Sequence, residues 1–348
     1  MAIFGLGGSK TTVALDIGSG LIKLVAIDHG KSEPVLARVS LTPVLADAIV
    51  EGEIMDPGIV SDTIQGLFKT AGVKQKRVSV AVGGRDVIIK KIQVDRMKES
   101  DAYEVVRWEA QQHVPFDIEA VELDFQILDP EGDGLQMDVL LVAAKRELVE
   151  DKVQLLAQAG LEAEIVDVDA FALHNAFEVN YPEAMRGVVA LLNIGHELTN
   201  VNILQDGVPL LTRDLSVGTR KFREDLQRER GLSAEDADAM LQGFDRAPDL
   251  DPYIQSRGEE IAVGLERAGA FLQSASRDAG SIQGVFCSGG GARVPGLTEV
   301  LSQRLRVPVE VASPIHRLSV RDGVFDTVSI DEVAPLLMLA TGLALRRS

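Results

Sequence analysis

The sequence predicts an α/β protein of two similar halves, the first of which carries an additional α+β segment. Three observations support this fold class. Residues 13–27 form two apolar runs around a glycine-containing turn, which is the pattern of a β-hairpin. Residues 189–207 repeat that pattern, and residues 96–166 have no counterpart in the second half. At 348 residues, 46% of them hydrophobic, the chain is long and apolar enough for more than one domain.

The turn of the first hairpin has a composition suited to binding an anion. It contains Asp16, Ser19 and two glycines, Gly18 and Gly20. Glycines let backbone N–H groups approach a phosphate without an intervening Cβ, and a carboxylate can hold a divalent cation through water. Such turns are more often only structural, so this hairpin alone does not define a site. Lys23 follows in the second run, where it either reaches a phosphate or is a solvated strand residue.

The second hairpin strengthens the interpretation of the first as a binding site, because the two sequences can be aligned. A shift of 177 residues carries one onto the other. The residues that then coincide include Ile17 with Ile194, Gly18 with Gly195, Leu21 with Leu198 and Gly30 with Gly207. Two turns of one design suggest that a polyphosphate is gripped between them.

A third glycine-rich segment lies near the end of the chain. The apolar strand at residues 285–287 runs into four small residues, namely Ser288, Gly289, Gly290 and Gly291. A helix is expected after them at residues 295–305. Such a turn allows a flat ligand or a phosphate to lie on bare backbone, although an ordinary tight turn between strand and helix has the same pattern. Residues 81–84 occupy a comparable place in the first half.

Charge, cysteine content and missing motifs exclude several classes of protein. The net charge of −18 argues against nucleic acid and anionic lipid as direct partners. Cys287 is the single cysteine, so an internal disulfide is excluded and a buried thiol is expected. No zinc-binding, nucleophile-elbow or P-loop pattern occurs. No apolar run approaches the ~20 residues that span a bilayer, and residues 1–10 lack the features of a signal peptide.

Patterning along the chain suggests four parts. We expect a first half at residues 1–95, an α+β insert at 96–166, a connection at 167–186 and a second half at 187–348. Within the second half, the residue pattern of 219–280 predicts a helical subdomain. Residues 333–346 are apolar on almost all sides, which favours a core helix between the halves over a membrane-surface helix.

Three segments together resemble the nucleotide-binding motifs of the actin and Hsp70-like ATPase superfamily. Residues 16–20 (DIGSG) and 193–199 (NIGHELT) resemble its two phosphate motifs, and residues 287–293 (CSGGGAR) resemble its adenosine motif. The resemblance implies two RNase-H-like halves that close over ATP and Mg. It covers essentially the whole chain.

The same resemblance implies a set of nucleotide-binding residues. The set comprises Asp16, Gly18, Ser19, Gly20, Lys23, Asn193, Gly195, His196, Thr199, Gly218, Ser288, Gly289, Gly290 and Gly291. Asp16 would hold Mg through water and is the candidate catalytic residue. The phosphates would be held by Gly18, Ser19, Gly195 and Thr199, and the adenosine would be backed by Gly289 and Gly290.

One residue of this set departs from the superfamily pattern. Asn193 stands where Asp is typical, which removes a charge that would orient Mg or its waters. In the connecting segment, Asp167 and Asp169 are each able to activate a water. The sequence therefore predicts ATP binding, with hydrolysis weak or absent.

The insert carries the most specific resemblance. Residues 107–117 (RWEAQQHVPFD) and 123–125 (LDF) are similar to a signature of the PilM family of type IV pilus assembly proteins. This similarity implies an insert of the type found in FtsA, with a groove beside it that binds the N-terminal cytoplasmic peptide of the inner-membrane protein PilN. The chain would then be cytoplasmic, peripheral to the inner membrane through that partner, and linked to other pilus machinery proteins. Self-association is a further expectation.

Three functions remain open from the sequence. The first is a scaffold that binds ATP without appreciable turnover and docks the PilN peptide. The second is a catalyst, either an actin-like ATPase or a sugar-kinase-like phosphotransferase, although the insert shows no acidic base in a polar sugar cleft. The third is an FtsA-like filament former, which the apolar rather than amphipathic C-terminal segment weakens. We favour the scaffold.

Overall fold

Two sheets with the same strand order form the framework of the computed structural model, which describes residues 11–30, 32–242, 248–275, 280–326 and 328–347. Within these residues the first sheet has the order β10-β6-β1-β2-β3-β16, and the second has the order β15-β14-β11-β12-β13. The first consists of β1 (Thr11–Ile17), β2 (Leu21–Asp28), β3 (Val35–Pro43), β6 (Arg77–Val82), β10 (Glu162–Val168) and β16 (Ser319–Val320). The second consists of β11 (Val188–Ile194), β12 (Thr199–Gln205), β13 (Val208–Leu215), β14 (Gly284–Ser288) and β15 (Val309–Val311).

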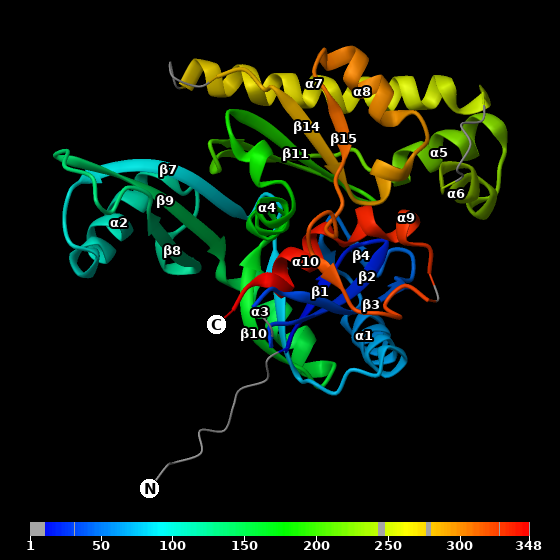
Figure 1. Cartoon of the computed structure of the whole chain (residues 1–348), viewed down its shortest axis with the longest axis horizontal. Coiled ribbons are helices and arrows are strands. Elements are labelled where there is room, and N and C mark those ends of the chain that lie inside the picture. Colours follow the sequence, from blue (N-terminus) through cyan, green and yellow to red (C-terminus); the bar gives the residue numbers. More distant parts are fainter. Residues whose placement is uncertain (1–10, 31, 243–247, 276–279, 327, 348) are drawn as a thin grey trace, which may run out of the picture.

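The two sheets are equivalent strand by strand, which confirms the predicted duplication (Figure 1). In each sheet a three-stranded antiparallel meander continues into parallel strands: β6 pairs with β1 and β14 pairs with β11. The register of the two hairpins is also the same, because Ile17 pairs with Ile22 and Ile194 with Thr199, which lie 177 residues apart. Both hairpins predicted from the sequence are therefore present, and the structure adds their common register.

In the first half, α1 (Pro57–Ala71) and α3 (Arg146–Gln158) pack against the sheet through one shared apolar core. α1 begins where the Asp56 carboxylate accepts a hydrogen bond from the Ile59 N–H at 3.0 Å and ends at Gly72, which has φ +65°. A short hairpin of β4 (Ile49–Val50) and β5 (Glu53–Ile54) precedes α1.

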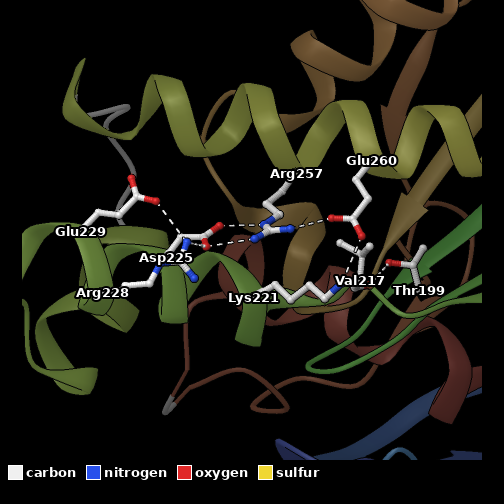
Figure 2. A network of polar contacts seen from close by, with 8 residues as sticks. All are labelled: Thr199, Val217, Lys221, Asp225, Arg228, Glu229, Arg257 and Glu260. Carbon is white, nitrogen blue, oxygen red and sulfur yellow. Dashed lines mark hydrogen bonds and ion pairs between the residues drawn. The ribbon is translucent and has the colours of Figure 1, made fainter.

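In the second half a group of helices is built on the sheet, as predicted for residues 219–280. It comprises α5 (Thr219–Arg230), α6 (Ala234–Gln242) and α7 (Asp251–Ala275), and α8 (Leu297–Leu305) follows β14. Figure 2 shows how α5 is held to α7: Arg257 donates two hydrogen bonds to the buried Asp225, at 2.7 and 2.9 Å, and one to Glu260 at 2.7 Å. Lys221 also donates to Glu260, at 3.0 Å, so the position of α5 is fixed by charged hydrogen bonds on one of its faces.

The insert is a three-stranded antiparallel sheet with one helix, and it lies to the left in Figure 1. Its order is β7-β9-β8, from β7 (Val87–Asp95), β8 (Val121–Ile127) and β9 (Gln136–Lys145), and α2 (Glu99–His113) packs on it. The short turn of 3₁₀ helix at Ile118–Ala120 completes its core. The insert therefore has an apolar core of its own.

The boundaries of the insert differ from the predicted residues 96–166 at both ends. β7 was assigned to the first half but pairs along its whole length with β9. α3 and β10 were assigned to the insert but belong to the first half, where β10 pairs in parallel with β6. These pairings join residues far apart in sequence, so local patterning could not reveal them.

The connection and the C-terminal segment pack together between the halves. α4 (Asp169–Asn180) and the 3₁₀ turn Pro182–Met185 form the connection. The predicted helix at 333–346 is divided into α9 (Ile330–Val333), a 3₁₀ turn at Ala334–Leu337 and α10 (Met338–Leu345), with Pro335 at the break. α10 is buried against β1, β2 and α4, and Met338 also reaches Phe286 of the second half. This segment therefore lies in the core between the halves, as two short helices joined by a 3₁₀ turn.

Candidate functional site

The tips of the two hairpins face each other across a cavity of about 580 Å³ between the halves. The approach is close, because a Cβ placed on Gly20 would lie 3.0 Å from the Cβ of His196. The cavity also extends along the glycine turn after β14 and along the first turns of α5. The two turns that the repeated sequence pattern predicts therefore lie on opposite sides of one cavity.

Both tips are closed by the same backbone hydrogen bond. The Gly18 N–H donates to the Leu21 carbonyl at 3.2 Å, and the Gly195 N–H donates to the Leu198 carbonyl at 2.8 Å. In each tip a Cβ on the glycine would come within 3.0–3.2 Å of the carbonyl oxygen that accepts this bond. The tightness of the turn therefore favours glycine at both positions, in agreement with the two sequences.

The second tip is also held by the first turn of α5. The amides of Thr219 and Arg220 donate to the carbonyls of Gly195 and His196, at 3.0 and 2.8 Å. Gly218 precedes this helix, and a Cβ there would lie 2.4 Å from the His196 carbonyl oxygen. Gly218 therefore lets the tip approach the start of the helix, and does not itself line the cavity.

The polar pairs behind the two tips occupy equivalent places but differ in charge. Behind the first tip, Lys23 Nζ donates to Asp16 Oδ2 at 2.7 Å, and these side chains are only 14% and 11% exposed. Behind the second, Asn193 Nδ2 donates to Asn200 Oδ1 at 3.3 Å. Lys23 is thus neither a solvated lysine nor a free cation, because it neutralises Asp16 at the edge of the cavity.

The third glycine segment forms the wall beside the second tip. Gly289 has φ +81°, and a Cβ there would lie 2.5 Å from the Ile194 carbonyl oxygen and 2.6 Å from Asn193 Oδ1. Gly290 lines the cavity beside it, whereas Gly291 packs on Ile194, where a Cβ would lie 2.1 Å from a side-chain carbon. A side chain has no space at Gly289, whereas a Cβ on Gly290 would have no neighbour closer than 3.9 Å.

Ten of the fourteen predicted residues line the cavity. These are Asp16, Gly18, Ser19, Gly20, Lys23, Asn193, Gly195, His196, Gly289 and Gly290. The other four, Thr199, Gly218, Ser288 and Gly291, are in its supporting layer.

Thr199 is a correction to the expected phosphate ligands. Its side chain is fully buried at the start of β12, and its Oγ1 donates to the Val217 carbonyl at 2.6 Å (Figure 2). Ser288 is likewise buried, and its Oγ contacts are to Leu192 and Asn193. The sequence motifs placed both residues in the correct strands. They did not show that each side chain points into the core and not into the cavity.

A lysine that sequence reasoning missed lines the cavity from the first half. Lys152 of α3 is 6% exposed and makes no hydrogen bond or ion pair with any residue that the structure describes. Burial lowers the pKa of its ammonium group, and the charges of Asp169 and Asp16 oppose this. The available signal was its spacing: Lys152 follows Leu148 and precedes Leu156 by four residues each, on the apolar face of a helix.

Asp169, the first residue of α4, brings a second carboxylate to the cavity. Burial first, and then the charge of Asp16, raise the pKa of Asp169 to about 7, and the charge of Lys152 opposes this shift. The carboxylate occupies the space above Gly83, where a Cβ would lie 2.2 Å from Asp169 Oδ2. Asp167, by contrast, is buried outside the cavity with Oδ2 3.4 Å from Arg346 Nε.

The far end of the cavity is lined by the helical part of the second half. The residues there include Thr219, Arg220, Arg223, Asp238, Leu241, Gln242 and Arg293. His196 Nδ1 lies 3.3 Å from Thr219 Oγ1, and burial together with the charge of Arg223 lowers the pKa of His196, so that the ring is neutral at pH 7. This end therefore combines apolar side chains with charged ones, most of them arginines, whereas the carboxylates of Asp16 and Asp169 lie at the end near the first tip.

Two features are absent from the part of the chain that the structure describes. Among the residues that the structure describes, no group of three His, Cys, Asp or Glu side chains is placed to hold a metal ion. Within the same residues, no helix has both the length and the apolar character needed to cross a membrane. Cys287 is buried, and its pKa is raised to about 12 by burial, so it is a core thiol as expected.

Comparison with known proteins gives one family over nearly the whole chain. The family model for the type IV pilus assembly protein PilM matches residues 14–348. A chain of the solved PilM–PilN type IV pilus biogenesis complex has a TM-score of 0.84 and 29% identity, covering 96% of this chain and 98% of that one. The actin-like fold with two similar halves is therefore as predicted.

Two more distant proteins share the fold. The cell division protein FtsA of Bacillus subtilis (strain 168) is 22% identical over 371 residues, which cover 92% of this chain and 82% of FtsA. MreB 5 of Spiroplasma citri, solved with AMPPNP, has a TM-score of 0.50 and 12% identity, covering 97% of this chain and 95% of that one. From the family match over residues 14–348, the chain belongs to the PilM family of type IV pilus assembly proteins.

Proposed function

We propose that the chain is a scaffold of type IV pilus assembly that binds ATP with Mg in the cavity between its halves. The observation that carries the proposal is the pair of equivalent glycine tips facing each other across about 580 Å³. Two such tips present backbone N–H groups to a polyphosphate from both sides. MreB 5, which shares the fold, was solved with a nucleotide analogue.

The residues present fit a nucleotide at both ends of the cavity. At one end, Gly289 and Gly290 give the cavity wall a stretch of backbone without side chains, which suits a flat base. At the other, Lys152 lines the cavity with a largely buried side chain that makes no hydrogen bond or ion pair with a described residue, which suits a phosphate. Asp16 faces the same end, where it would bind Mg through water.

Calorimetric titration of Mg-ATP into the purified protein tests this proposal. We expect saturable binding that weakens about tenfold or more in Asp16→Asn, because the variant loses the carboxylate at the Mg position. Asp62→Asn, an exposed position on α1, is the matched control and should bind as the wild type does. Absence of binding to the wild-type protein would reject nucleotide binding.

A second candidate, slow ATP hydrolysis, is favoured by Asp169. A carboxylate in the cavity with a pKa of about 7 can accept a proton from water near neutral pH. Asn193, which lacks a charge, argues in the other direction. Steady-state phosphate release from wild type and Asp169→Asn decides between the two, because only hydrolysis through Asp169 predicts turnover that the variant loses while it still binds ATP.

We further propose that the insert side of the molecule binds the N-terminal cytoplasmic peptide of PilN, which would place this chain at the inner membrane. Its support is the similarity to a chain of a solved PilM–PilN complex. A second cavity, of about 300 Å³, lies between β7 of the insert and β12 and β13 of the second half. Val87, Ile88 and Ile89 give it an apolar side, and Ile88 also packs against the insert core.

Fluorescence anisotropy with a labelled PilN N-terminal peptide tests the docking site. Ile89→Glu should weaken binding about tenfold or more, because it places a charge in an apolar groove. Leu135→Glu is the matched control, since Leu135 is 91% exposed on the same insert and lies outside this cavity. Equal affinity of the two variants would exclude this cavity as the peptide site.

A further inference from the structure

The feature that the proposed function leaves unexplained is the position of Lys152. Two lysines line the cavity, and they differ in their partners. Lys23 is neutralised by Asp16 at 2.7 Å, whereas Lys152 is more than nine-tenths buried and has no hydrogen-bond partner among the described residues. Placing a lysine side chain in a largely buried position costs stability unless a partner compensates its charge, and a negatively charged ligand in the cavity would be such a partner.

The charges around Lys152 identify the end of the cavity that it serves. The carboxylates that act on it are those of Asp169 and Asp16, which belong to the end with the first tip. The base-like surface at Gly289 and Gly290 is on the second half instead. A long cationic side chain at the first tip can reach a phosphate group, which supplies both charge and hydrogen-bond acceptors.

Lys152 is also directly joined to the insert. β9, the central strand of the insert, ends at Lys145, and α3 begins at the next residue, Arg146. Arg146 Nε donates to Glu122 Oε1 of β8 at 2.7 Å, which ties the start of α3 to a second strand of the insert. The chain enters the insert through Gly83 and Gly84, which line the cavity as well. Both connections of the insert therefore meet the cavity wall.

We propose that Lys152 binds the terminal phosphate of a nucleoside triphosphate, and that this contact moves α3 so that the insert distinguishes the triphosphate from the diphosphate state. The inference rests on the nucleotide binding proposed above. A diphosphate lacks the group that Lys152 would hold, so the two ligands differ in their interaction with α3, which is the condition for shifting a conformational equilibrium. The two cavity lysines thus have different roles. Lys23 neutralises Asp16, and Lys152 binds the terminal phosphate of the triphosphate.

Affinities of Lys152→Met for ATP and ADP, each with Mg, test the phosphate contact. We expect ATP affinity to fall about tenfold or more while ADP affinity changes less than about threefold, as for the loss of one charged hydrogen bond. The unliganded variant should melt at a higher temperature than the wild type, because a buried amine is replaced by an apolar group of similar length. Lys69→Met, an exposed lysine on α1, is the matched control.

Hydrogen exchange tests the coupling to the insert. In the wild type, amide protection in residues 87–145 should differ between the ATP and ADP states, and this difference should be absent in Lys152→Met. Wild type that binds neither nucleotide overturns the proposed function itself. If the wild type binds both and Lys152→Met keeps its preference for ATP, only the assignment of Lys152 is overturned. A lower melting temperature of the unliganded Lys152→Met and of a second variant, Lys152→Gln, would likewise overturn it in favour of a structural role.

Discussion

The two halves of this molecule have the same strand order but differ in the residues that border the cavity. Asp16 and Lys23 form an ion pair behind the first tip, and the equivalent positions of the second tip hold the amides Asn193 and Asn200. The backbone of the two turns is nevertheless the same. The comparison teaches that turn geometry is fixed by glycine and by strand register, whereas the charge behind the turn is free to diverge.

A second difference lies at the junction after the parallel strand. In the second half, β14 passes through Gly289 and Gly290 and continues directly to α8. In the first half, β6 passes through Gly83 and Gly84, and the whole insert stands between these glycines and α3. The insert therefore occupies a junction that already bordered the cavity, which is why a change at the ligand can reach it.

The largest effect is expected at the glycine turn of the second half. Gly289→Ala combines a left-handed backbone with a collision against Ile194 and Asn193, so we expect a loss of about 3 kcal/mol or more in unfolding free energy. Gly52→Ala is the matched control, because Gly52 has φ +90° with nothing within 4 Å of its Cβ position, and should lose about 1 kcal/mol. Equal losses in urea denaturation would show that the collision is relieved.

The next effect concerns the charged pair of the first tip. Asp16→Asn leaves the mostly buried Lys23 without its partner and should cost about 2 kcal/mol. The double variant Asp16→Asn, Lys23→Asn gives the first tip the composition of the second and should recover most of that loss. The prediction is contradicted if urea denaturation shows the double variant to be less stable than the single one. The first tip would then not tolerate the residues of the second.

The last effect depends on pH, and its size follows from the pKa shift at about 1.4 kcal/mol for each pH unit between the unfolded and the folded pKa. The pKa of Asp169 is about 7 in the folded protein and lies near 4 when unfolded, so the folded state holds more protons in this window and wild-type stability falls as the pH rises through it. Asp169→Asn should therefore match the wild type below pH 4 and be more stable than it above pH 7. Unfolding curves at pH 5 and pH 8 check this. A gain that is independent of pH would contradict the assigned cause.

Local features could be predicted from the sequence, and features that depend on tertiary pairing could not. The tips at Gly18 and Gly195 could be predicted because a tight turn favours glycine at a fixed place among neighbouring residues. Thr199 was placed in the site wrongly, because the inward face of β12 depends on the helix and loop packed against it. Lys152 was missed because only the packing of α3 shows which of its faces borders the cavity. The limits of the insert were missed for the same reason.

The central claim is that one nucleotide is held by both tips, and equivalent substitutions in the two tips test it most directly. Ser19 and His196 are equivalent residues, 177 apart, and both line the cavity. Calorimetric titration of Mg-ATP should show that Ser19→Glu and His196→Glu each lower affinity about tenfold or more, because each places a carboxylate against the phosphates. If either folded variant binds ATP as tightly as the wild type, the nucleotide is not shared between the tips and the account is wrong.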